Sequence, residues 1–234
     1  MTDRPSTSRP YVTDNPSPVI FRFRFSRPDS RNALDLDLVR QLQHELSSIT
    51  DGVVVIGSTH AESFSSGADV KLSNEDRADV SRALYDLYEA MLLSPCPIIA
   101  VIEGHAVGGG AQIALAADMR IAGPGARFQF PGVQHGIPIG MWALPDTVGR
   151  SRALDLCLTA RWVDATEAHC IGLVDRLVDD AMNEALRIAK DMSAWPRGAT
   201  ASIKASSNSS GVLTRLRAEA AECATWSGAL GHQT

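Results

Sequence analysis

The sequence predicts an α/β fold with a helical C-terminal region. Over the first half of the chain, segments with the alternating or continuous apolar character of strands alternate with segments of helical spacing. The last third has mostly helical spacing, and a glycine-rich turn joins an apolar strand to a helix within 98–118. These observations favour one core domain over 18–180, followed by a helical region over 181–234.

Each predicted element has a local signal. Phenylalanines alternate with arginines over 19–25, which indicates a strand, and a Pro-Asp turn follows it. Apolar residues recur at helical spacing over 36–49, where Asp35 is a candidate N-cap. The same criteria predict strands over 53–56, 98–102 and 172–178, short strands near Arg120 and Phe128, loops over 59–69 and 131–145, and helices over 75–93, 152–159, 165–170, 181–192, 198–205 and 212–226.

Composition and charge argue against several classes of protein. The chain has 234 residues, of which 44% are hydrophobic and 21% charged, so it can bury one full core. Its net charge of −5 argues against a nucleic-acid partner. No apolar run approaches the roughly 18 residues of a membrane span. Residues 1–17 are rich in Ser, Pro, Asp and Thr and are predicted to be a disordered leader.

The cysteines indicate a reducing compartment. The chain has four of them, and none stands in the C-x-x-C spacing of a zinc or redox site. We therefore expect no metal site and no disulfide framework, and a cytoplasmic location. The cysteines are Cys96, Cys157, Cys170 and Cys223.

The glycine-rich turn is suited to holding negative charge. Gly108, Gly109 and Gly110 begin a helix, whose first N–H groups lack intrahelical partners and lie at the positive end of the helix dipole. The spacing is not the G-x-G-x-x-G of a dinucleotide site, and no Lys-Ser/Thr follows, as a phosphate-binding P-loop requires. A turn needed only for packing is the alternative.

A second loop of the same kind lies earlier in the chain. The sequence 65–69 (SSGAD) also follows a strand and precedes a helix. Two such loops at the same ends of neighbouring strands can direct their N–H groups at one point, which is the arrangement of an oxyanion hole. Such a pair of donors suits the oxygen of a thioester as it becomes an enolate.

The motifs together resemble those of the enoyl-CoA hydratase/isomerase, or crotonase, superfamily. The resemblance runs from about residue 19 to 178, and more weakly to about 225. It implies a crotonase-like ββα spiral fold and an acyl-CoA thioester as substrate, without a permanently bound cofactor. It also implies a homotrimer or hexamer, in which the C-terminal region, which looks truncated, forms the trimer contacts. It is carried by 27–34 (RPDSRNAL), 64–71 (FSSGADVK), 97–110 (PIIAVIEGHAVGGG), 117–118 (AD), 130–131 (FP), 136–138 (GIP), 166–168 (TEA) and 172–174 (GLV).

The resemblance also implies site residues. Carried over by motif position, the oxyanion donors are the backbone N–H groups of Ala68 and Gly109. The loop over 66–71 passes the adenine and pantetheine of coenzyme A, and an arginine or lysine lies near the phosphates. The residues expected along coenzyme A are Arg31, Ala33, Leu34, Ser66, Ala68, Asp69, Val70 and Lys71.

The catalytic carboxylates are where this sequence departs from the family. Hydratases of the family add water with two glutamates, and the matching positions here are Gln112 and Gly132. Neither residue can act as a general base. His135 and Asp146 lie near enough in the sequence to substitute for them. Introducing glutamate at both positions is expected to raise hydration.

Other polar and aromatic residues have more ordinary interpretations. His105, Glu103, Asp118 and Asp69 are expected to have structural roles, and the G-x-S-x-G motif that a serine hydrolase needs is absent. Three large side chains are candidates for an acyl pocket or for ordinary core, namely Met141, Trp142 and Trp162. The charged residues of the last helix are expected to form a solvated face, namely Arg215, Arg217, Glu219 and Glu222.

Three functions remain open from the sequence. The first is an acyl-CoA-binding protein, nominally an enoyl-CoA hydratase or isomerase of fatty acid metabolism, that stabilises a thioester enolate in a backbone oxyanion hole. The second is an enzyme of a different CoA-thioester reaction, such as isomerisation, hydrolysis, decarboxylation or dehalogenation, that uses His135 or Asp146. The third is a non-catalytic acyl-CoA-binding protein.

Overall fold

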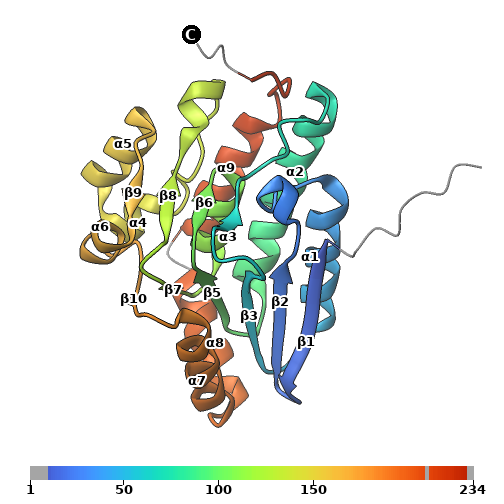
Figure 1. Cartoon of the computed structure of the whole chain (residues 1–234), viewed down its shortest axis with the longest axis vertical. Helices are drawn as coiled ribbons and strands as arrows, with labels where there is room; N and C mark the ends of the chain where they lie inside the picture. Colours follow the sequence, from blue (N-terminus) through green and yellow to red (C-terminus); the bar gives the residue numbers. More distant parts are fainter. Residues whose placement is uncertain (1–9, 209–210, 231–234) are drawn as a thin grey trace, which may run out of the picture.

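A computed structural model describes residues 10–208 and 211–230 of the chain. Its larger sheet has six strands in the order β1-β2-β3-β5-β7-β10, all parallel except β1, which pairs antiparallel with β2 (Figure 1). The strands are β1 (Tyr11–Ser17), β2 (Ile20–Phe25), β3 (Val53–Ser58), β5 (Ile98–Ile102), β7 (Met119–Ala122) and β10 (Arg176–Leu177).

A smaller sheet of four strands continues from the larger one. Its order is β4-β6-β8-β9, and its strands are β4 (Ser63–Ser65), β6 (His105–Val107), β8 (Arg127–Gln129) and β9 (Val163–Asp164). Along the chain, β3 leads to β4, β5 to β6 and β7 to β8, so three successive segments contribute one strand to each sheet. A helix follows each of the first two strand pairs, which is the predicted ββα spiral.

Nine helices are seen in the described part of the chain, with two short 3-10 turns. The helices are α1 (Leu36–Ser48), α2 (Asn74–Leu93), α3 (Gly109–Ala116), α4 (Leu144–Val148), α5 (Arg150–Thr159), α6 (Ala165–Cys170), α7 (Ala181–Ser193), α8 (Arg197–Asn208) and α9 (Val212–Cys223). The 3-10 turns are Pro28–Ser30 and Pro131–His135. Asp35 caps α1 as predicted, since its side chain accepts from the Leu38 N–H at 2.9 Å.

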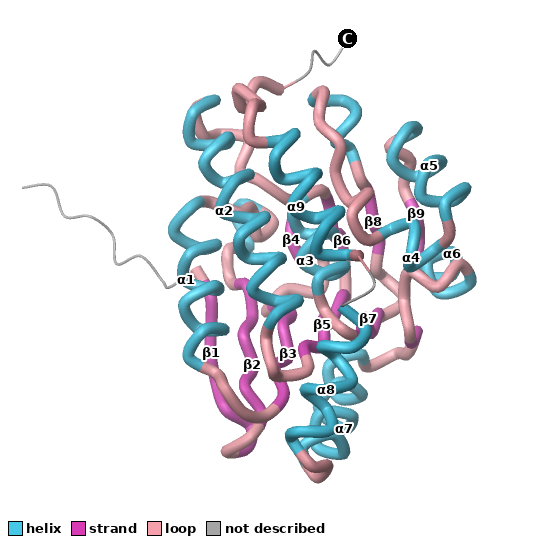
Figure 2. The backbone as a smooth tube through the Cα atoms, turned by 180° about the vertical axis from the view of Figure 1, so that it is seen from behind, coloured by secondary structure: helices cyan, strands magenta, loops and turns pink. Residues whose placement is uncertain are grey.

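The larger sheet is buried on both faces because its strands alternate between two cores. Val54 and Ile56 face the main core, which includes side chains of α1, α2, α3 and α9. Val53 and Val55 face a smaller core with Ala185 of α7. Figure 2 shows α7 on the opposite side of the sheet from α1 and α2. The helices after residue 180 therefore complete the same cores as the residues before it.

Three expectations of the sequence analysis need correction. The strand predicted over 172–178 is limited to β10, Arg176–Leu177. Residues Tyr11–Ser17 form the edge strand β1, so the disordered leader predicted over 1–17 is wrong for this part, while 1–9 lie outside the described residues. Arg22 of β2 binds Asp14 of β1 at 2.7 Å, and Tyr11 stacks on Phe23, so tertiary pairing orders a polar segment. The polar loop predicted over 59–69 contains β4.

No helix in the described part of the chain is both long enough and apolar enough to span a membrane.

Candidate active site

A cavity of about 600 Å³ lies where the two glycine loops meet α2 and the segment that follows α9. Figures 1 and 2 both show α2, α3, β6 and α9 grouped together around this region. Its apolar wall comes from Leu84, Ile137, Ile139, Trp226 and Leu230. Seven of the predicted site residues line it together, namely Ser66, Ala68, Val70, Gly109, Gln112, Gly132 and His135.

Backbone pairing turns the Ala68 N–H group away from Leu34. The Leu34 N–H donates to the Gly67 carbonyl at 2.8 Å, and the Asp69 N–H donates to the Leu34 carbonyl at 2.9 Å. In this parallel bridge Leu34 bonds to the residues on either side of Ala68. The N–H of Ala68 itself therefore points away from Leu34, and Ala68 is a lining residue of the cavity.

The Gly109 N–H group is available because it begins a helix. Gly109 is the first residue of α3, and the first N–H groups of a helix have no intrahelical acceptor. A side chain on Gly109 would place its Cβ 2.7 Å from Leu84 Cδ1, so the Leu84 side chain would have to shift to admit it. A Cβ atom added at Gly67 would lie 3.4 Å from the Gly109 nitrogen, so the two loops are in contact.

Gln112 is held by two donors at the cavity wall. Its Oε1 accepts from the Gly140 N–H and from Trp142 Nε1, each at 3.0 Å. Two donors on one atom identify that atom as the oxygen of the amide. Trp142 is fully buried and stacks on Tyr88 with ring centroids 5.9 Å apart. Trp142 thus belongs to the core beneath the cavity.

Gly132 is packed so closely that a side chain does not fit. Its Cβ position would lie 2.5 Å from the Ile137 carbonyl oxygen and 2.6 Å from Ile139 Cγ1. Ile139 therefore occupies the space that a glutamate at 132 would need. Glutamates at 112 and 132 are therefore not expected to raise hydration together, because a glutamate at 132 has no space.

Glu219 is a buried carboxyl group that the sequence analysis assigned wrongly to a solvated face. Its Oε1 accepts from the Tyr85 hydroxyl and the Gly140 N–H, and its Oε2 accepts from the Trp142 N–H, each at 2.9 Å. Burial raises the pKa of Glu219 to about 7, although these hydrogen bonds oppose the rise. The signal was available, because Glu219 lies on the buried stripe of α9 with Leu216.

The two candidate substitutes for the missing glutamates lie in different places. His135 lines the cavity, where burial and the nearby Arg77 guanidinium lower its pKa. This shift favours the neutral imidazole, which can accept a proton. Asp146 has a side chain that is 55% exposed and paired with Arg215, and it does not line the cavity. The structure therefore brings only His135 to the site.

The residues predicted along coenzyme A divide into four groups. Ser66, Ala68 and Val70 line the cavity, and Val70 is 67% exposed at its mouth. Asp69 braces the loop by accepting from the Lys71 N–H at 2.9 Å. The side chains of Ala33 and Leu34 are buried, and Arg31 and Lys71 are exposed outside the cavity lining.

Arg77 connects the cavity mouth to the C-terminal segment. Its buried guanidinium donates to the carbonyls of Val70, Leu72 and Gly228, the last at 2.8 Å. The segment held in this way carries Trp226 and Leu230 over the cavity. The end of the described chain therefore forms part of the wall.

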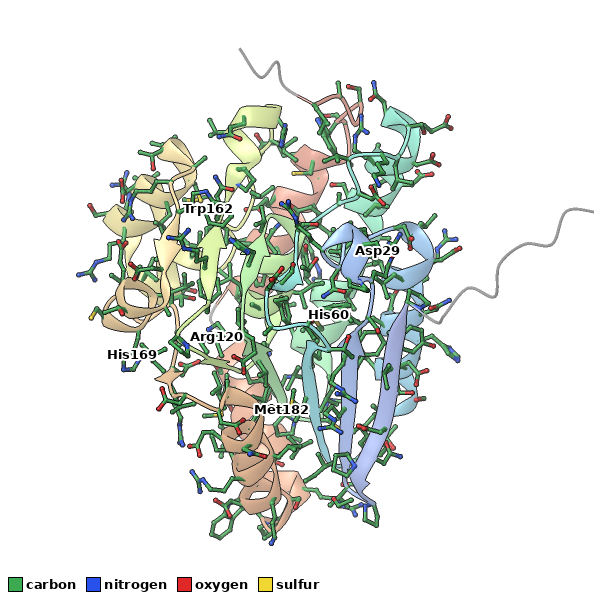
Figure 3. All side chains as sticks on the ribbon, in the orientation of Figure 1. Asp29, His60, Arg120, Trp162, His169 and Met182 are labelled. Carbon is green, nitrogen blue, oxygen red and sulfur yellow. The ribbon has the colours of Figure 1, made fainter. Side chains whose placement is uncertain are left out.

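The remaining candidates have structural contacts. Asp118 accepts from the Ile98 N–H at 2.7 Å and pairs with Lys204, and the side chain of Glu103 lies beneath Gly123. Trp162, labelled in Figure 3, is 43% exposed and lies edge-on to His105 at 5.2 Å. Trp162 is not part of the cavity lining, and Met141 lines a separate hollow.

Comparison with known proteins shows the family and the fold of this chain. The profile of the enoyl-CoA hydratase/isomerase family matches residues 17–227. A probable enoyl-CoA hydratase of Mycobacterium leprae is 38% identical over 202 residues, covering 76% of this chain and 69% of that protein. An enoyl-CoA hydratase/isomerase structure from Xanthobacter autotrophicus Py2 superposes with a TM-score of 0.86 at 28% identity, covering 96% of this chain and 90% of that one. A monofunctional enoyl-CoA isomerase from M. smegmatis gives a TM-score of 0.75 at 29% identity, covering 90% and 99%. The chain belongs to the enoyl-CoA hydratase/isomerase family.

Proposed function

We propose that this protein binds an acyl-CoA thioester in the cavity and stabilises its enolate with the N–H groups of Ala68 and Gly109. The observation that carries the proposal is that Ala68 and Gly109 line one cavity, on loops that are in contact. One such donor typically contributes a factor of about 10²–10³ to kcat. The apolar wall suits the acyl chain, since it offers aliphatic and aromatic surface beside the donors.

The reaction that this site favours is proton transfer along the acyl chain rather than addition of water. Gln112 and Gly132 offer no general base at the positions of the hydratase glutamates. General acid–base catalysis contributes about 10²–10⁴ for each group. An enolate can still form and collapse if one other group moves the proton, as in the isomerisation of a 3-enoyl-CoA to the 2-enoyl-CoA. We therefore infer isomerase chemistry.

The proposal is tested by comparing two reactions in one preparation. Purified protein should isomerise 3-hexenoyl-CoA and should hydrate crotonyl-CoA at least about 100-fold more slowly than a family hydratase that has both glutamates. Hydration at the rate of that reference enzyme would refute the inference of isomerase chemistry. Calorimetry with hexanoyl-CoA measures binding separately, and no binding would refute the proposal as a whole.

A second candidate is a non-catalytic acyl-CoA-binding protein. It is favoured by Gln112, whose amide oxygen is fully engaged by Gly140 and Trp142 and performs no proton transfer. This candidate predicts binding of hexanoyl-CoA without turnover of any 3-enoyl or 2-enoyl thioester. The isomerisation assay separates the two candidates.

The assembly and location expected from the sequence remain proposals. A homotrimer or hexamer is proposed on the family resemblance, and sedimentation equilibrium measures it. Cytoplasmic residence is proposed on the four cysteines, which are all unpaired in the structure. Fractionation of the native cells would test it.

A further inference from the structure

The Glu219 carboxyl group lies beside the side chain that replaces the first hydratase glutamate. The Gly140 N–H donates to Gln112 Oε1 at 3.0 Å and to Glu219 Oε1 at 2.9 Å, so the two oxygens share one donor. Gln112 comes from α3 and Glu219 from α9, 107 residues further along the chain. A carboxyl group is therefore present next to the expected position, supplied by a different helix.

Tyr85 connects this carboxyl group to the cavity. The Tyr85 hydroxyl donates to Glu219 Oε1 at 2.9 Å, and Tyr85 is a lining residue of the cavity that holds the oxyanion donors. Glu219 itself is not part of that lining. Tyr85 thus both lines the cavity and hydrogen-bonds to Glu219, and its hydroxyl oxygen also lies 3.3 Å from Cys223 Sγ.

The surroundings of Glu219 keep its charge state responsive near neutral pH. The titratable groups around it are Tyr85 and Tyr88 from α2, Cys157 from α5 and Cys223 from α9. Burial raises the pKa of each of these groups, so all four are neutral at pH 7. Among the described residues no cation pairs with Glu219, and burial raises its pKa to about 7.

We propose that Tyr85 and Glu219 form a proton relay for the enolate chemistry, with Tyr85 as the catalytic residue and Glu219 as the group that stores the proton. This inference rests on the proposed function. The thioester Cα–H bond breaks, its proton bonds to the Tyr85 oxygen, and the Tyr85 hydroxyl proton passes to Glu219 Oε1. The electron pair of the C–H bond enters the enolate, whose oxygen is held by Ala68 and Gly109. Return of the proton to Cγ by the same route completes an isomerisation.

A purely structural role is the competing explanation. Glu219 accepts the N–H groups of Gly140 and Trp142 and so holds the turn over 140–142 in place. A glutamine at 219 keeps one acceptor for this turn but cannot store a proton. The pH dependence of kcat separates the roles, because a brace for the turn does not titrate with the reaction.

The test measures two quantities, the isomerisation of 3-hexenoyl-CoA and the binding of hexanoyl-CoA. Isomerisation is followed from pH 5.5 to 9, which is about the range in which a buried carboxyl group and its neighbours titrate. For the intact protein, kcat should rise with pH through about 7, where Glu219 becomes ionised and can accept a proton. Glu219→Gln and Tyr85→Phe should each lower kcat by at least about 100-fold and remove this rise, with Kd for hexanoyl-CoA within a few-fold of the original. Glu222→Gln, an exposed position on the same segment, is the matched control and should change neither quantity.

The outcomes separate the two proposals. If the unaltered protein does not bind hexanoyl-CoA, the proposed function fails and the relay fails with it. If it binds the thioester but does not isomerise 3-hexenoyl-CoA, the inferred isomerase chemistry fails together with the relay, and thioester binding stands. If the protein isomerises this substrate and either variant keeps kcat and the pH profile, the relay alone is overturned. If Glu219→Gln does not fold, Tyr85→Phe decides the matter, since it removes one hydroxyl and leaves the carboxyl in place.

Discussion

The free energy of unfolding should fall as the pH rises toward 8, and replacing Glu219 with glutamine should make this fall smaller. Burial raises the pKa of Glu219 from an ordinary 4.5 to about 7 in the folded chain. At about 1.4 kcal/mol for each pKa unit, this difference corresponds to about 3 kcal/mol of folding free energy. The side chain is 6% exposed, so screening by solvent reduces this value little.

The sign follows from proton binding. Between pH 4.5 and about 7 the folded state keeps the Glu219 proton while the unfolded state has lost it. The stabilisation is therefore complete below pH 4.5 and is lost as the pH rises through about 7. Urea unfolding at pH 5 and pH 8 should show this loss in the original protein and a smaller one, by about 2–3 kcal/mol, in Glu219→Gln.

Comparing how the free energy of unfolding changes with pH in the two proteins isolates the contribution of Glu219. Other titrating residues, including Glu103, whose pKa burial also raises, contribute equally to both proteins. A constant offset from placing the glutamine amide against the Trp142 N–H also cancels between the two pH values. Parallel pH dependence in the two proteins would refute the assignment of a raised pKa to Glu219.

Three further predictions concern other parts of the structure. Ala68→Pro removes one oxyanion donor and should lower the kcat of isomerisation by about 100-fold or more. Ala68→Gly keeps the N–H group, so its kcat should stay within a few-fold of the original value. Equal rates in the two variants would contradict the oxyanion role. Gly132→Glu should reduce the free energy of unfolding by about 1–3 kcal/mol because its Cβ meets Ile139 Cγ1, and Ile139→Ala should relieve part of that loss in a double-mutant cycle of urea midpoints. Lys204→Ala should lower the free energy of unfolding by about 2–3 kcal/mol, because the Asp118 carboxylate loses its ammonium partner at 2.8 Å. A change below about 0.5 kcal/mol in urea unfolding would show that this ion pair contributes little.

Regular segments of the fold could be predicted because their local patterns agree with their tertiary environment. The helical spacing over 36–49 and the cap at Asp35 gave α1, and the apolar run over 98–102 gave β5. The edge strand β1 was missed because Tyr11–Ser17 is polar and partly exposed. Its order comes from pairing with β2, which lies outside any local pattern.

The candidate site could be predicted where backbone groups define it. The glycine turn and the SSGAD loop placed Ala68 and Gly109 on one cavity, because short sequence motifs fix backbone conformation. The buried Glu219 was missed, although it lies on the same stripe of α9 as Leu216, because Arg215 and Arg217 beside it suggest a solvated helix face. Only the packing of α9 on α2 buries the carboxyl and supplies the Tyr85 hydroxyl.

The close packing at Gly132 determines the order in which this cavity could be redesigned. A glutamate introduced there first meets both the Ile137 carbonyl oxygen and the Ile139 side chain, so it is penalised before it can assist any reaction. The turn over 137–139 has to be moved beforehand, and that change by itself brings no catalytic gain. A laboratory selection for hydration that proceeds by single substitutions should therefore avoid position 132 and accumulate its first changes in the neighbouring turn.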